Sequence, residues 1–531
     1  MNSQSNPLLE ILASMPEAAS RLEDYLAHWA RVTPHEVATI SEAGRLTYAD
    51  LAEHVALAAA NLKHDGVIAG DIVAVLAPPS NDFLVSFLAA VTLGAVWLGL
   101  NPKYTLREIE QVVSDAKPRL LLIRTRVGAR DFKLDSAALG EMAGRTRTGL
   151  RWLELQPDRL VSPYFTQAHN ASPPAAVEGA DKTRSRIAAL VYTSGSTGLP
   201  KGAMLSHRAL IRAALVRSTV WRVAPLRLIN NVPINHVGGL GDLACTALVA
   251  GGSQVFLETF SAEGTLAAID RNRVTYWYQA PTMFEMCFNR PEAREVDWSS
   301  LQAAIWSGGR ASASLVERMS ALARYVAVDY SMTESVGPIA MSTLSSLGRD
   351  LTDTVGWPEP GRHLTLHSSD LQALQGDVMC GEVLLNDQWM FDGYRADGVA
   401  RNKDEWFRTG DLVEKALDGS WRIVGRSKDM FKSGGYNVYP REVEMILEQH
   451  PAVETAIVVS APDPVYLEIG IAFVRVRGTA TVAELKEHCR SLLANYKIPK
   501  QVHFLREFPM LPVGKIDRAK LKVDARDCLA S

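Results

Sequence analysis

Short apolar runs alternate with stretches of helical periodicity through the first four hundred residues of the chain. The runs are rich in β-branched and aliphatic residues and are bounded by Gly, Pro or polar residues, which predicts strands. The clearest strand patterns occupy 71–78, 119–125, 187–194 and 252–258. Helical patterns occupy 83–94, 206–221 and 261–272. Because strands and helices alternate, we predict an α/β fold with layered, largely parallel sheets.

The pattern changes near the C-terminal end of the chain. A predicted hairpin at 417–424 runs into a segment rich in Gly and Lys, and two further strands are predicted at 452–463 and 469–478. A helix follows over 481–496, with Thr481 as its N-cap. We therefore predict a large N-terminal domain over 1–425 and a small α+β domain over 426–531.

Size and composition agree with a multidomain globular protein that binds small molecules. At 531 residues the chain exceeds one hydrophobic core, and its 47% hydrophobic and 22% charged residues are ordinary for globular proteins. The formal charge is -3, without a block of one sign, so no nucleic-acid partner is predicted. Five widely separated cysteines fit neither a disulfide framework nor a zinc site.

One segment could be read as a membrane span. The apolar run from Phe83 to Leu100 has about the right length, but it contains Ser86, Thr92 and two glycines. Because a strand pattern and a turn precede it, we favour a buried helix and predict no integral membrane segment. The N-terminal residues lack the basic start of a secretory signal, so a cytoplasmic location is expected.

The candidate chemistry begins at "LVYTSGSTGLPKGAMLSH", from Leu190 to His207. A strand, a turn rich in Gly and hydroxyl residues, and a helix capped by Ser206 form the geometry of a phosphate cradle. The pattern differs from a P-loop, because Lys201 precedes Gly202 instead of following the last glycine. Taken alone, such a loop could equally be an ordinary surface turn.

The loop resembles the phosphate-binding signature of the adenylate-forming superfamily, in the branch of acyl- and aryl-CoA synthetases. Further segments that resemble motifs of this family follow in order across nearly the whole chain. They are "PINHVGG" at 233–239, "WSGGRAS" at 306–312, "DYSMTES" at 329–335, "RTGDL" at 408–412, "VGRSKDMFKSGGYNVYPREVE" at 424–444 and "LPVGKIDRAKL" at 511–521.

The resemblance implies a two-step reaction. A carboxylate attacks the α-phosphorus of ATP to give acyl-AMP and pyrophosphate, and a thiol then attacks the mixed anhydride. ATP, Mg²⁺ and CoA as co-substrate are the implied cofactors, and a small carboxylic acid is the implied partner. The family also implies a β-barrel-like part in the large domain and a mobile small domain. A homo-oligomer is compatible with the sequence.

The resemblance assigns roles to individual residues. Lys515 is the expected catalytic lysine of the first step, with Thr333, Glu334 and His236 as further catalytic residues. Glu334 and Thr197 are the expected Mg²⁺ ligands. The implied ATP- or AMP-binding residues are Thr193, Ser194, Gly195, Ser196, Thr197, Gly198, Lys201, Gly308, Gly309, Arg310, Asp329, Tyr330, Ser331, Thr333, Asp411, Arg426 and Lys515.

Other positions are assigned to the acyl pocket, the thiol channel and the hinge. The expected acyl pocket is largely apolar, which suits an aliphatic or aromatic acid. Its residues are His236, Val237, Gly238, Ala280, Pro281, Trp306, Ser307, Ser331, Pro338 and Ile339. The expected CoA channel contains Lys432, Ser433, Gly434 and Gly435, and Lys428 is the expected hinge. Because Val237 stands where amino-acid adenylating relatives carry Asp, an α-amino acid substrate is disfavoured.

Two positions depart from the family pattern. Arg310 and Ala311 stand where many members have Ala and Pro, and Ser331 replaces a common Gly. Either change could narrow the acyl pocket. Arg310 could also pair with a polar substrate tail, or it could simply be exposed to solvent.

Several functions remain open at this point. The first is an ATP-dependent acid:CoA ligase, and a close alternative loads the acyl group onto the phosphopantetheine of a carrier protein. A luciferase-like oxygenase shares the first step. A kinase-like phosphoryl transferase would release ADP instead of AMP and pyrophosphate, and a nucleotide-binding regulatory protein would release neither.

Overall fold

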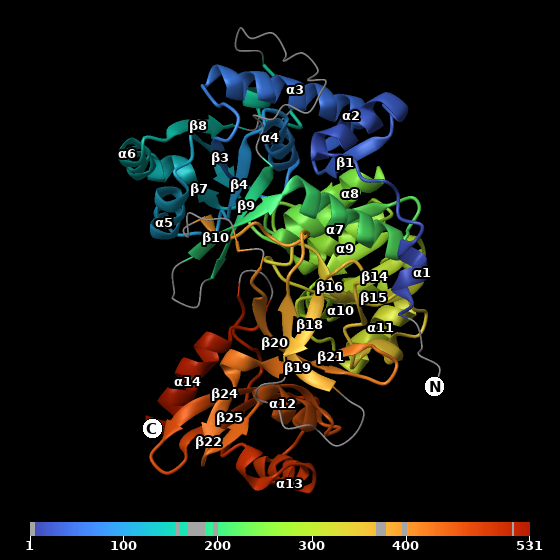
Figure 1. The fold of residues 1–531 in the computed structure, drawn as a ribbon, viewed down its shortest axis with the longest axis vertical. Coiled ribbons are helices and arrows are strands. Elements are labelled where there is room, and N and C mark those ends of the chain that lie inside the picture. The colour runs from blue at the N-terminus through green and yellow to red at the C-terminus, as the bar shows by residue number, and fades with distance from the viewer. Residues whose placement is uncertain are drawn as a thin grey trace.

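The computed structural model describes residues 6–154, 159–167, 186–194, 200–367, 379–395, 401–402, 404–511 and 515–530. Figure 1 shows a large region that contains the N-terminal and central elements and a smaller region at its lower end that contains the last ones. The element order confirms a mixed α/β fold with a large N-terminal part and a small C-terminal part. The boundary between 425 and 426 and the mobility of the small part stay predictions.

A six-stranded sheet occupies one side of the large part, in the order β10-β9-β4-β3-β5-β8. All its neighbours are parallel except β9 and β10, which form an antiparallel pair. Its strands are β3 (Ile72–Leu76), β4 (Val96–Leu100), β5 (Leu120–Arg124), β8 (Gly149–Leu153), β9 (Ile187–Ser194) and β10 (Pro200–Ser206). One face packs on helices α3 (Tyr48–His64), α4 (Asn81–Thr92) and α7 (His207–Val220). The other face packs on α5 (Leu106–Ala116) and α6 (Ser136–Thr146).

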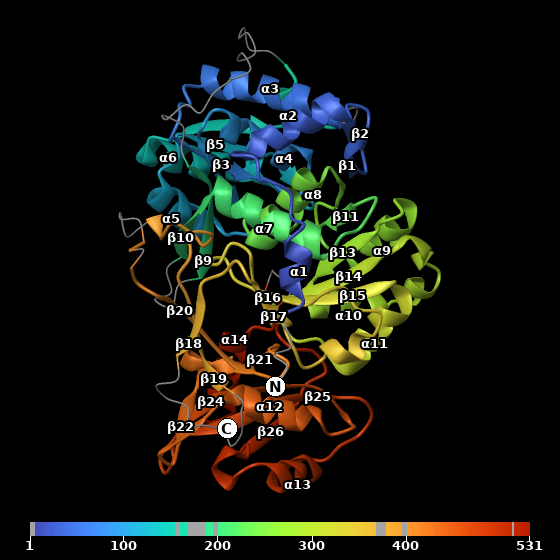
Figure 2. The ribbon, with the colours of Figure 1, turned by 45° about the vertical axis from the view of Figure 1, so that its right-hand side comes forward.

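A nine-stranded sheet lies beside it, in the order β17-β16-β15-β14-β13-β11-β12-β1-β2. Its strands are β1 (Val37–Ser41), β2 (Gly44–Thr47), β11 (Arg227–Asn230), β12 (Ser253–Phe256), β13 (Tyr276–Gln279), β14 (Ala303–Ser307), β15 (Tyr325–Ser331), β16 (Pro338–Met341) and β17 (Trp357–Pro358). One face packs on α1 (Leu8–Leu12), α7, the π-helix η3 (Gly238–Cys245) and α8 (Thr246–Ala250). The other packs on α9 (Ala262–Arg271), α10 (Pro281–Phe288) and α11 (Ala313–Leu322). Helix α7 therefore contributes to both layers, and Figure 2 shows it between the two sheets.

The apolar run from Phe83 to Leu100 is divided between two buried elements. Helix α4 ends at Thr92, a turn follows with Gly94 in the left-handed region, and strand β4 begins at Val96. Residues of both elements belong to the same buried core. Within the described ranges, no helix is long and apolar enough to cross a bilayer.

A third, antiparallel sheet joins the large part to the small one. It contains β18 (Leu364–His367), β19 (Met379–Leu385), β20 (Phe407–Lys415) and β21 (Trp421–Arg426), in that order. The predicted hairpin is thus confirmed, with its turn between β20 and β21. The predicted barrel-like part is not confirmed, because the described strands form an open sheet.

The small part is an α+β unit with its own core, as predicted. Its five-stranded sheet has the order β23-β22-β25-β24, and β26 pairs with β25. Its elements are β22 (Phe431–Ser433), β23 (Tyr436–Val438), α12 (Pro440–Glu448), β24 (Val453–Asp463), β25 (Leu467–Val476), α13 (Val482–Leu492), β26 (Gln501–Phe504) and α14 (Arg518–Ala530). The Thr481 hydroxyl accepts the amide of Glu484 and confirms the predicted cap of α13.

Candidate active site

Several of the predicted site residues lie at the carboxyl ends of β13, β14 and β15. These three strands are parallel neighbours, and such strand ends are where open α/β sheets bind ligands. Ala280 follows β13, Ser307 ends β14 and Ser331 ends β15. Gly308 then turns the chain away from β14 with a φ of 77°, a conformation that favours glycine.

Lys515 reaches this edge from the small C-terminal part. Its carbonyl accepts the amide of Leu511 at 2.7 Å, and this hydrogen bond fixes its backbone. Its side chain lies against the turn after β14, because a Cβ added to Gly308 would lie 2.8 Å from Lys515 Cε. Burial lowers the pKa of Lys515, the positive charge of Arg426 lowers it further, and the negative charge of Asp411 opposes both.

Tyr330, Asp411 and Arg426 form one hydrogen-bonded group across two sheets. The Tyr330 hydroxyl donates to Asp411 Oδ2 at 2.8 Å, and Arg426 Nε donates to Asp411 Oδ1 at 2.8 Å. Burial, followed by the charge of Asp411, raises the pKa of Tyr330, which keeps its hydroxyl a donor. Tyr330 also packs in an apolar cluster with Ile339 and Val413, so its ring is largely buried. The group places a carboxylate and a guanidinium beside the Lys515 side chain.

Glu334 contacts the segment that contains Phe391 and Tyr394 and that pairs with strand β10. Its Oε1 accepts the Tyr394 hydroxyl at 2.6 Å, and its carbonyl accepts the amide of Phe391. Tyr394 pairs with Ala203 of β10, and the Lys201 ammonium lies 5.3 Å from the centre of the Tyr394 ring. Tyr394 therefore connects the lysine of the predicted phosphate loop to the predicted metal ligand. No sequence motif indicated this tyrosine.

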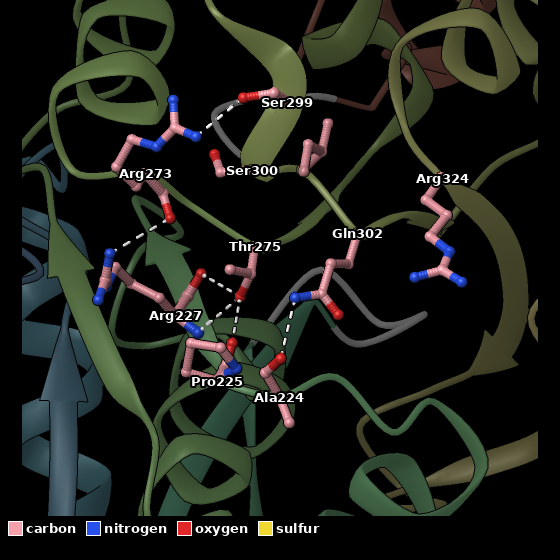
Figure 3. Close-up of a pocket in the computed structure, with 10 residues that line it drawn as sticks. Ala224, Pro225, Arg227, Arg273, Thr275, Ser299, Ser300, Gln302 and Arg324 are labelled. Carbon is pink, nitrogen blue, oxygen red and sulfur yellow. Dashed lines mark hydrogen bonds between the residues drawn. The ribbon is translucent and has the colours of Figure 1, made fainter.

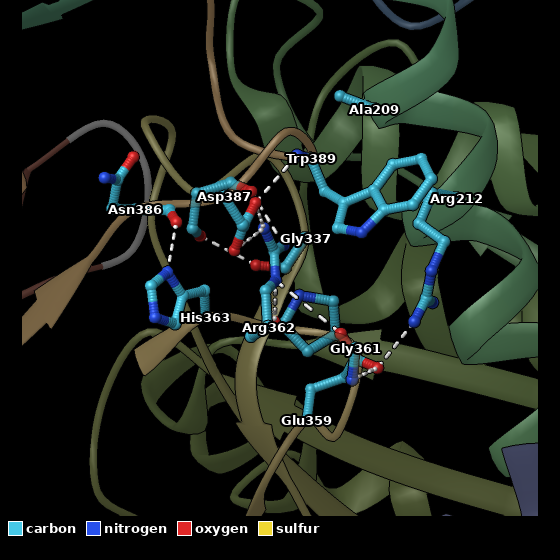
Figure 4. Close-up of polar contacts among 12 residues, drawn as sticks. Ala209, Arg212, Gly337, Glu359, Gly361, Arg362, His363, Asn386, Asp387 and Trp389 are labelled. Atoms are coloured by element: carbon cyan, nitrogen blue, oxygen red, sulfur yellow. Dashed lines mark hydrogen bonds and ion pairs between the residues drawn. The ribbon is translucent and has the colours of Figure 1, made fainter. Parts of the chain in front are cut away.

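The turn that carries Thr333 and Glu334 is held by the buried side chain of Arg362, and Figure 4 shows this arginine with Asp387. Arg362 donates to the carbonyls of Pro338 at 3.0 Å and Ser335 at 2.7 Å. Its guanidinium also pairs with Asp387 at 3.3 Å. Burial lowers the pKa of Arg362, and the neighbouring carboxylates oppose that shift. The hydrogen bonds from Arg362 therefore fix the backbone next to Thr333 and Glu334, whose side chains are both buried.

The predicted phosphate loop is described only at its two ends. Thr193 pairs with Lys201 across the β9–β10 ladder, and Ser194 pairs with Pro200. The cap of α7 is confirmed, because the Ser206 hydroxyl accepts the amide of Ala209 at 3.2 Å. The remaining predicted loop residues lie outside the described residues: Gly195, Ser196, Thr197 and Gly198.

His236 lies close to Lys515 and is uncharged. Burial lowers its pKa to about 4, and the positive charge of Lys515 acts in the same direction. Its Nδ1 accepts the amide of Gly238 at 3.0 Å. The ring proton of the neutral imidazole is therefore on Nε2, which leaves that atom as a donor.

The predicted acyl-pocket residues come from several elements and not all from one face of the sheet. Val237 and Gly238 are buried at the start of η3, while Ala280 and Pro281 lie at the start of α10. Strand alternation directs Trp306 to the face opposite Ser307, where it packs against the α9–α11 layer. Ser331 is paired with Pro338 at the end of β15, and Ile339 is buried in the cluster that contains Tyr330.

Arg310 contacts protein carboxylates on both sides of the site. Its guanidinium pairs with Asp353 of the large part, and Nη1 donates to Glu448 Oε2 of α12 at 2.8 Å. Its Nε also donates to the carbonyl of Thr352 at 3.2 Å. Arg310 thus bridges the two parts of the chain. A second bridge joins Arg475 of β25 to Glu285 of α10 at 2.9 Å.

The predicted hinge and CoA residues lie in the small part or at its start. Lys428 is exposed in the short helix η8 (Ser427–Asp429), directly after β21. Lys432 and Ser433 lie on β22, and Gly434 and Gly435 form its turn to β23 with φ values of 58° and 88°. In both ribbon views β22 lies toward the outer end of the small part, away from the large one (Figures 1 and 2).

Sequence reasoning missed a buried ionic cluster that includes Asp329 of strand β15. Arg217 Nη2 lies 2.8 Å from Asp242 Oδ1 and 3.1 Å from Asp329 Oδ2. The Tyr278 hydroxyl donates to Asp329 Oδ1 at 3.0 Å. Asp329, predicted to bind nucleotide, is therefore occupied by protein partners. Its two side-chain partners come from two other elements, α7 and β13, and no local pattern signals such a contact.

A carboxylate at the end of the Glu334 turn suits a hard divalent cation. Only one Glu334 oxygen accepts the Tyr394 hydroxyl, and carboxylate oxygen is a preferred Mg²⁺ ligand. Across the described residues, no group of three or more His, Cys, Asp or Glu forms a metal site. Mg²⁺ commonly binds to one or two carboxylates together with substrate phosphates.

A pocket of about 490 Å³ lies at the opposite edge of the nine-stranded sheet. Figure 3 shows polar side chains from the amino ends of β11, β13, β14 and β15 around it. Its lining residues are Ala224, Pro225, Arg227, Arg273, Thr275, Ser299, Ser300, Leu301, Gln302 and Arg324. None of the predicted site residues lines this pocket.

Comparisons with known proteins agree with the geometry. The family model described as AMP-binding enzyme matches residues 26–395, and the model described as AMP-binding enzyme C-terminal domain matches 442–515. A feruloyl-CoA synthase from Amycolatopsis sp is 31% identical over 503 residues, which cover 93% of this chain and 96% of that protein.

Two further proteins are similar over nearly their whole length. A 3-[(3aS,4S,7aS)-7a-methyl-1,5-dioxo-octahydro-1H-inden-4-yl]propanoyl:CoA ligase from Mycobacterium tuberculosis is 30% identical, over 97% of this chain and 99% of that protein. The crystal structure of ATP-bound MatB from Rhodopseudomonas palustris superposes with a TM-score of 0.82 at 28% identity, over 96% of this chain and 99% of that one.

Proposed function

We propose that this chain activates an apolar aliphatic or aromatic carboxylic acid as acyl-AMP. The chain belongs to the AMP-binding enzyme family and is an acyl-CoA synthetase, and the proposal proceeds from that premise. One observation carries the proposal. Lys515 of the small part lies against the Gly308 turn of the large part, next to the group formed by Tyr330, Asp411 and Arg426. A cation held between two parts at a strand edge suits a reaction in which two anionic reactants must meet.

The nucleotide is held by the groups around this edge. Asp411 has two oxygens that suit the ribose hydroxyls, with Arg426 beside them and Tyr330 facing the adenine side. Lys201 and Thr193 hold the phosphates at the base of the β9–β10 loop, together with the loop residues 194–198. Gly308 and Gly309 let the backbone approach the base closely. A side chain at Gly308 would meet the Lys515 side chain.

The first step forms a bond between a carboxylate oxygen and the α-phosphorus of ATP. The bond from that phosphorus to its bridging oxygen breaks, and pyrophosphate leaves. The Lys515 ammonium reduces the repulsion between the two anions, and Thr333 donates to the α-phosphate. His236 is neutral and carries its proton on Nε2, so it orients the acyl group by donating a hydrogen bond and transfers no proton.

Glu334, together with Thr197, would hold Mg²⁺, which when bound neutralises phosphate charge. The Tyr394 hydroxyl orients the Glu334 carboxylate, and Arg362 fixes the turn that carries it. These two residues act through Glu334 and are positioning residues.

The second step transfers the acyl group to a thiol. The thiol sulfur attacks the acyl carbon, AMP leaves, and the thiol proton passes to solvent. The small domain, 426–531, rotates about Lys428 and replaces Lys515 at the site with the turn formed by Lys432, Ser433, Gly434 and Gly435. CoA is the proposed thiol, because similar proteins are a feruloyl-CoA synthase and a propanoyl:CoA ligase. A carrier-protein phosphopantetheine is the alternative acceptor.

Pyrophosphate release over a panel of carboxylic acids, with and without CoA, tests the proposal. We expect AMP and pyrophosphate with at least one acid and acyl-CoA only when CoA is added. Release of ADP, or no release with any acid, would refute the adenylating reaction. Acyl-AMP that accumulates in the presence of CoA and is consumed by a phosphopantetheine carrier would establish the alternative acceptor.

A further inference from the structure

Arg310 has no role in the proposed reaction, although it lies in the turn that carries Gly308 and Gly309. It is one of the positions at which the chain departs from the family pattern. Its side chain is 35% exposed, so the packing of a core does not explain an arginine at this position. Its contacts therefore need another explanation.

The guanidinium of Arg310 is held by oxygens of both parts of the chain. In the large part, Nε donates to the carbonyl of Thr352 at 3.2 Å and Nη2 pairs with Asp353. In the small part, Nη1 donates to Glu448 Oε2 at 2.8 Å. Each nitrogen of the planar guanidinium thus contacts a protein oxygen, which fixes its orientation.

Glu448 belongs to helix α12, and the contacts continue from it into the small part. Arg441 Nη2 donates to Glu448 Oε2 at 2.9 Å, and Arg441 Nη1 donates to Glu444 Oε2 at 3.1 Å. Arg518 Nη2 donates to Glu444 Oε1 at 2.7 Å. In both ribbon views α12 lies closer to β21 than α13 does (Figures 1 and 2). We call this series of alternating charges the ionic network; its members are Arg310, Glu448, Arg441, Glu444 and Arg518.

The ionic network is anchored at Glu444. This carboxylate is fully buried, and its Oε1 also accepts the amide of Val458 at 2.9 Å. Burial alone would raise the pKa of Glu444, but the positive charges of Arg518 and Arg441 outweigh burial and lower the pKa, so the carboxylate stays ionised. Charged hydrogen bonds are strong where water is excluded. The network therefore holds α12 and the start of α14 against strand β24.

The ionic network ends next to Lys515. Arg518 is the first residue of α14, three residues after Lys515, and its Nη1 also donates to the carbonyl of Val458 at 3.3 Å. The Lys515 side chain in turn lies against Gly308, in the same turn as Arg310. The contacts thus form a closed ring that begins and ends at the turn after β14.

We infer that Arg310 is a positioning residue, which holds the Lys515 ammonium at the Gly308 turn through the ionic network and contacts neither the nucleotide nor the acid. The inference rests on the proposed function, in which Lys515 acts in the first step. It differs from the expectation that Arg310 binds ATP or a polar substrate tail. A single exposed ion pair contributes little, whereas a network of several charges can orient the groups that it joins.

Arg310→Met tests the inference, because it keeps an unbranched stem and removes the guanidinium. Pyrophosphate release is measured with an acid that the wild-type protein activates, and acyl-CoA formation from supplied acyl-AMP and CoA is measured separately. We expect kcat for pyrophosphate release to fall about tenfold, because Lys515 is no longer held in place, with KM for ATP and for the acid changed by less than about twofold. Thiol transfer should change by less than about twofold, since Lys515 leaves the site for that step.

The double variant with Arg310→Met and Lys515→Met separates a positioning role from a direct contact. If Arg310 acts through Lys515, its removal should change the residual adenylation of Lys515→Met by less than about twofold. A residue that contacted ATP or the acid itself would still lower this residual activity by the full amount.

Two further variants and a control test the route through Glu448. Glu448→Gln removes the charge of the partner and keeps its shape, so it should lower kcat as Arg310→Met does, and the two together should lower it no further. Arg310→Lys keeps the positive charge and should restore part of kcat. Arg422→Met is the matched control, because Arg422 Nε donates to the carbonyl of Asp353 but lies within the large part. The control should leave both half-reactions unchanged.

Four outcomes would overturn the inference while wild-type adenylation stands. They are an unchanged kcat in Arg310→Met, an equal loss of both half-reactions, a full additional loss in the Lys515→Met background, and a loss expressed in KM for ATP or in the preference among acids. The last of these would assign Arg310 to the nucleotide or to a substrate tail. If the wild-type protein releases no pyrophosphate with any acid, the proposed function fails together with the inference.

Discussion

Replacement of Lys515 by Met tests the central assignment most directly. Met keeps an apolar stem of similar length against the Gly308 turn and removes only the ammonium. The substitution leaves the Tyr330–Asp411–Arg426 group intact, because its two hydrogen bonds join these three residues to one another. We therefore expect a specific loss of acyl-AMP formation with little change in the fold.

The size of the loss follows from the position of the charge. The Lys515 ammonium is half-buried, and burial lowers its pKa, so water screens it less than it would screen a surface lysine. Two unit charges about 4 Å apart interact by about 4 kcal/mol at an effective dielectric constant of about 20. Loss of one preorganised donor at other active sites costs about 100- to 1000-fold in rate. We expect a reduction of adenylation within that range.

The assay separates the two half-reactions. Pyrophosphate release reports adenylation, and formation of acyl-CoA from supplied acyl-AMP and CoA reports thiol transfer. Lys515→Met should reduce the first by at least about 100-fold and change the second by less than about threefold, since Lys515 leaves the site for that step. Lys520→Met is the matched control, because Lys520 pairs with Asp524 of the same helix, α14, and its side chain is exposed.

Equal loss of both half-reactions would refute the division of labour between the two arrangements. Unchanged adenylation would refute the assignment of Lys515 itself. Loss of both activities together with a lower melting temperature would indicate a folding defect, and Lys515→Arg, which keeps the charge, should then restore part of the adenylation but not of the stability.

Three further outcomes follow from the same geometry. Because burial and Arg426 lower the pKa of Lys515, and because its protonated form is the active one, kcat/KM for pyrophosphate release should fall as pH rises through a value below 10.5; a flat profile to pH 10.5 would contradict this. Gly308→Ala places a Cβ at a φ of 77° and in contact with Lys515 Cε, so the substitution should slow adenylation by about tenfold or more and spare thiol transfer. Equal effects on the two half-reactions would contradict the role of this contact. Glu285→Gln removes the pair with Arg475, which is partly exposed, so adenylation should fall only about two- to fivefold, with the difference from wild type shrinking at high salt.

Local patterns predicted the elements of the fold well. The strand expected at 187–194 is β9 with the same bounds, and the helix expected over 206–221 is α7 with Ser206 as its cap. The helix expected from Phe83 to Gly94 is α4, which ends at Thr92, whereas the buried strand β4 that follows in the same apolar run was not predicted. These features depend on residues close together in sequence, which is why periodicity and capping reveal them.

Contacts between distant segments could not be predicted in this way. The Tyr394 hydroxyl reaches Glu334 across 60 residues, and Arg217 reaches Asp329 across 112. Trp306 was expected in the acyl pocket, yet strand alternation directs its side chain to the face of β14 opposite Ser307. The face that a strand residue occupies depends on where the strand begins, and the sequence pattern did not locate that start. The sequence likewise did not indicate the buried charges of Arg217 and Asp242, since each looks like an ordinary polar residue of an amphipathic helix.

The contacts between the two parts explain how one chain can serve two steps. The pairs of Arg310 with Glu448 and of Arg475 with Glu285 cross from the large part to the small one, and all four side chains are partly exposed to solvent. Pairs of this kind contribute only about 0–1 kcal/mol each, because solvent screens them. The small part can therefore leave this arrangement at a modest cost, and bound nucleotide or acyl-AMP need only favour one arrangement by a few kcal/mol to determine which is populated. A stronger, buried interface would hold Lys515 at the site more firmly, but it would also hinder the exchange with the Gly434–Gly435 turn that we propose for thiol transfer.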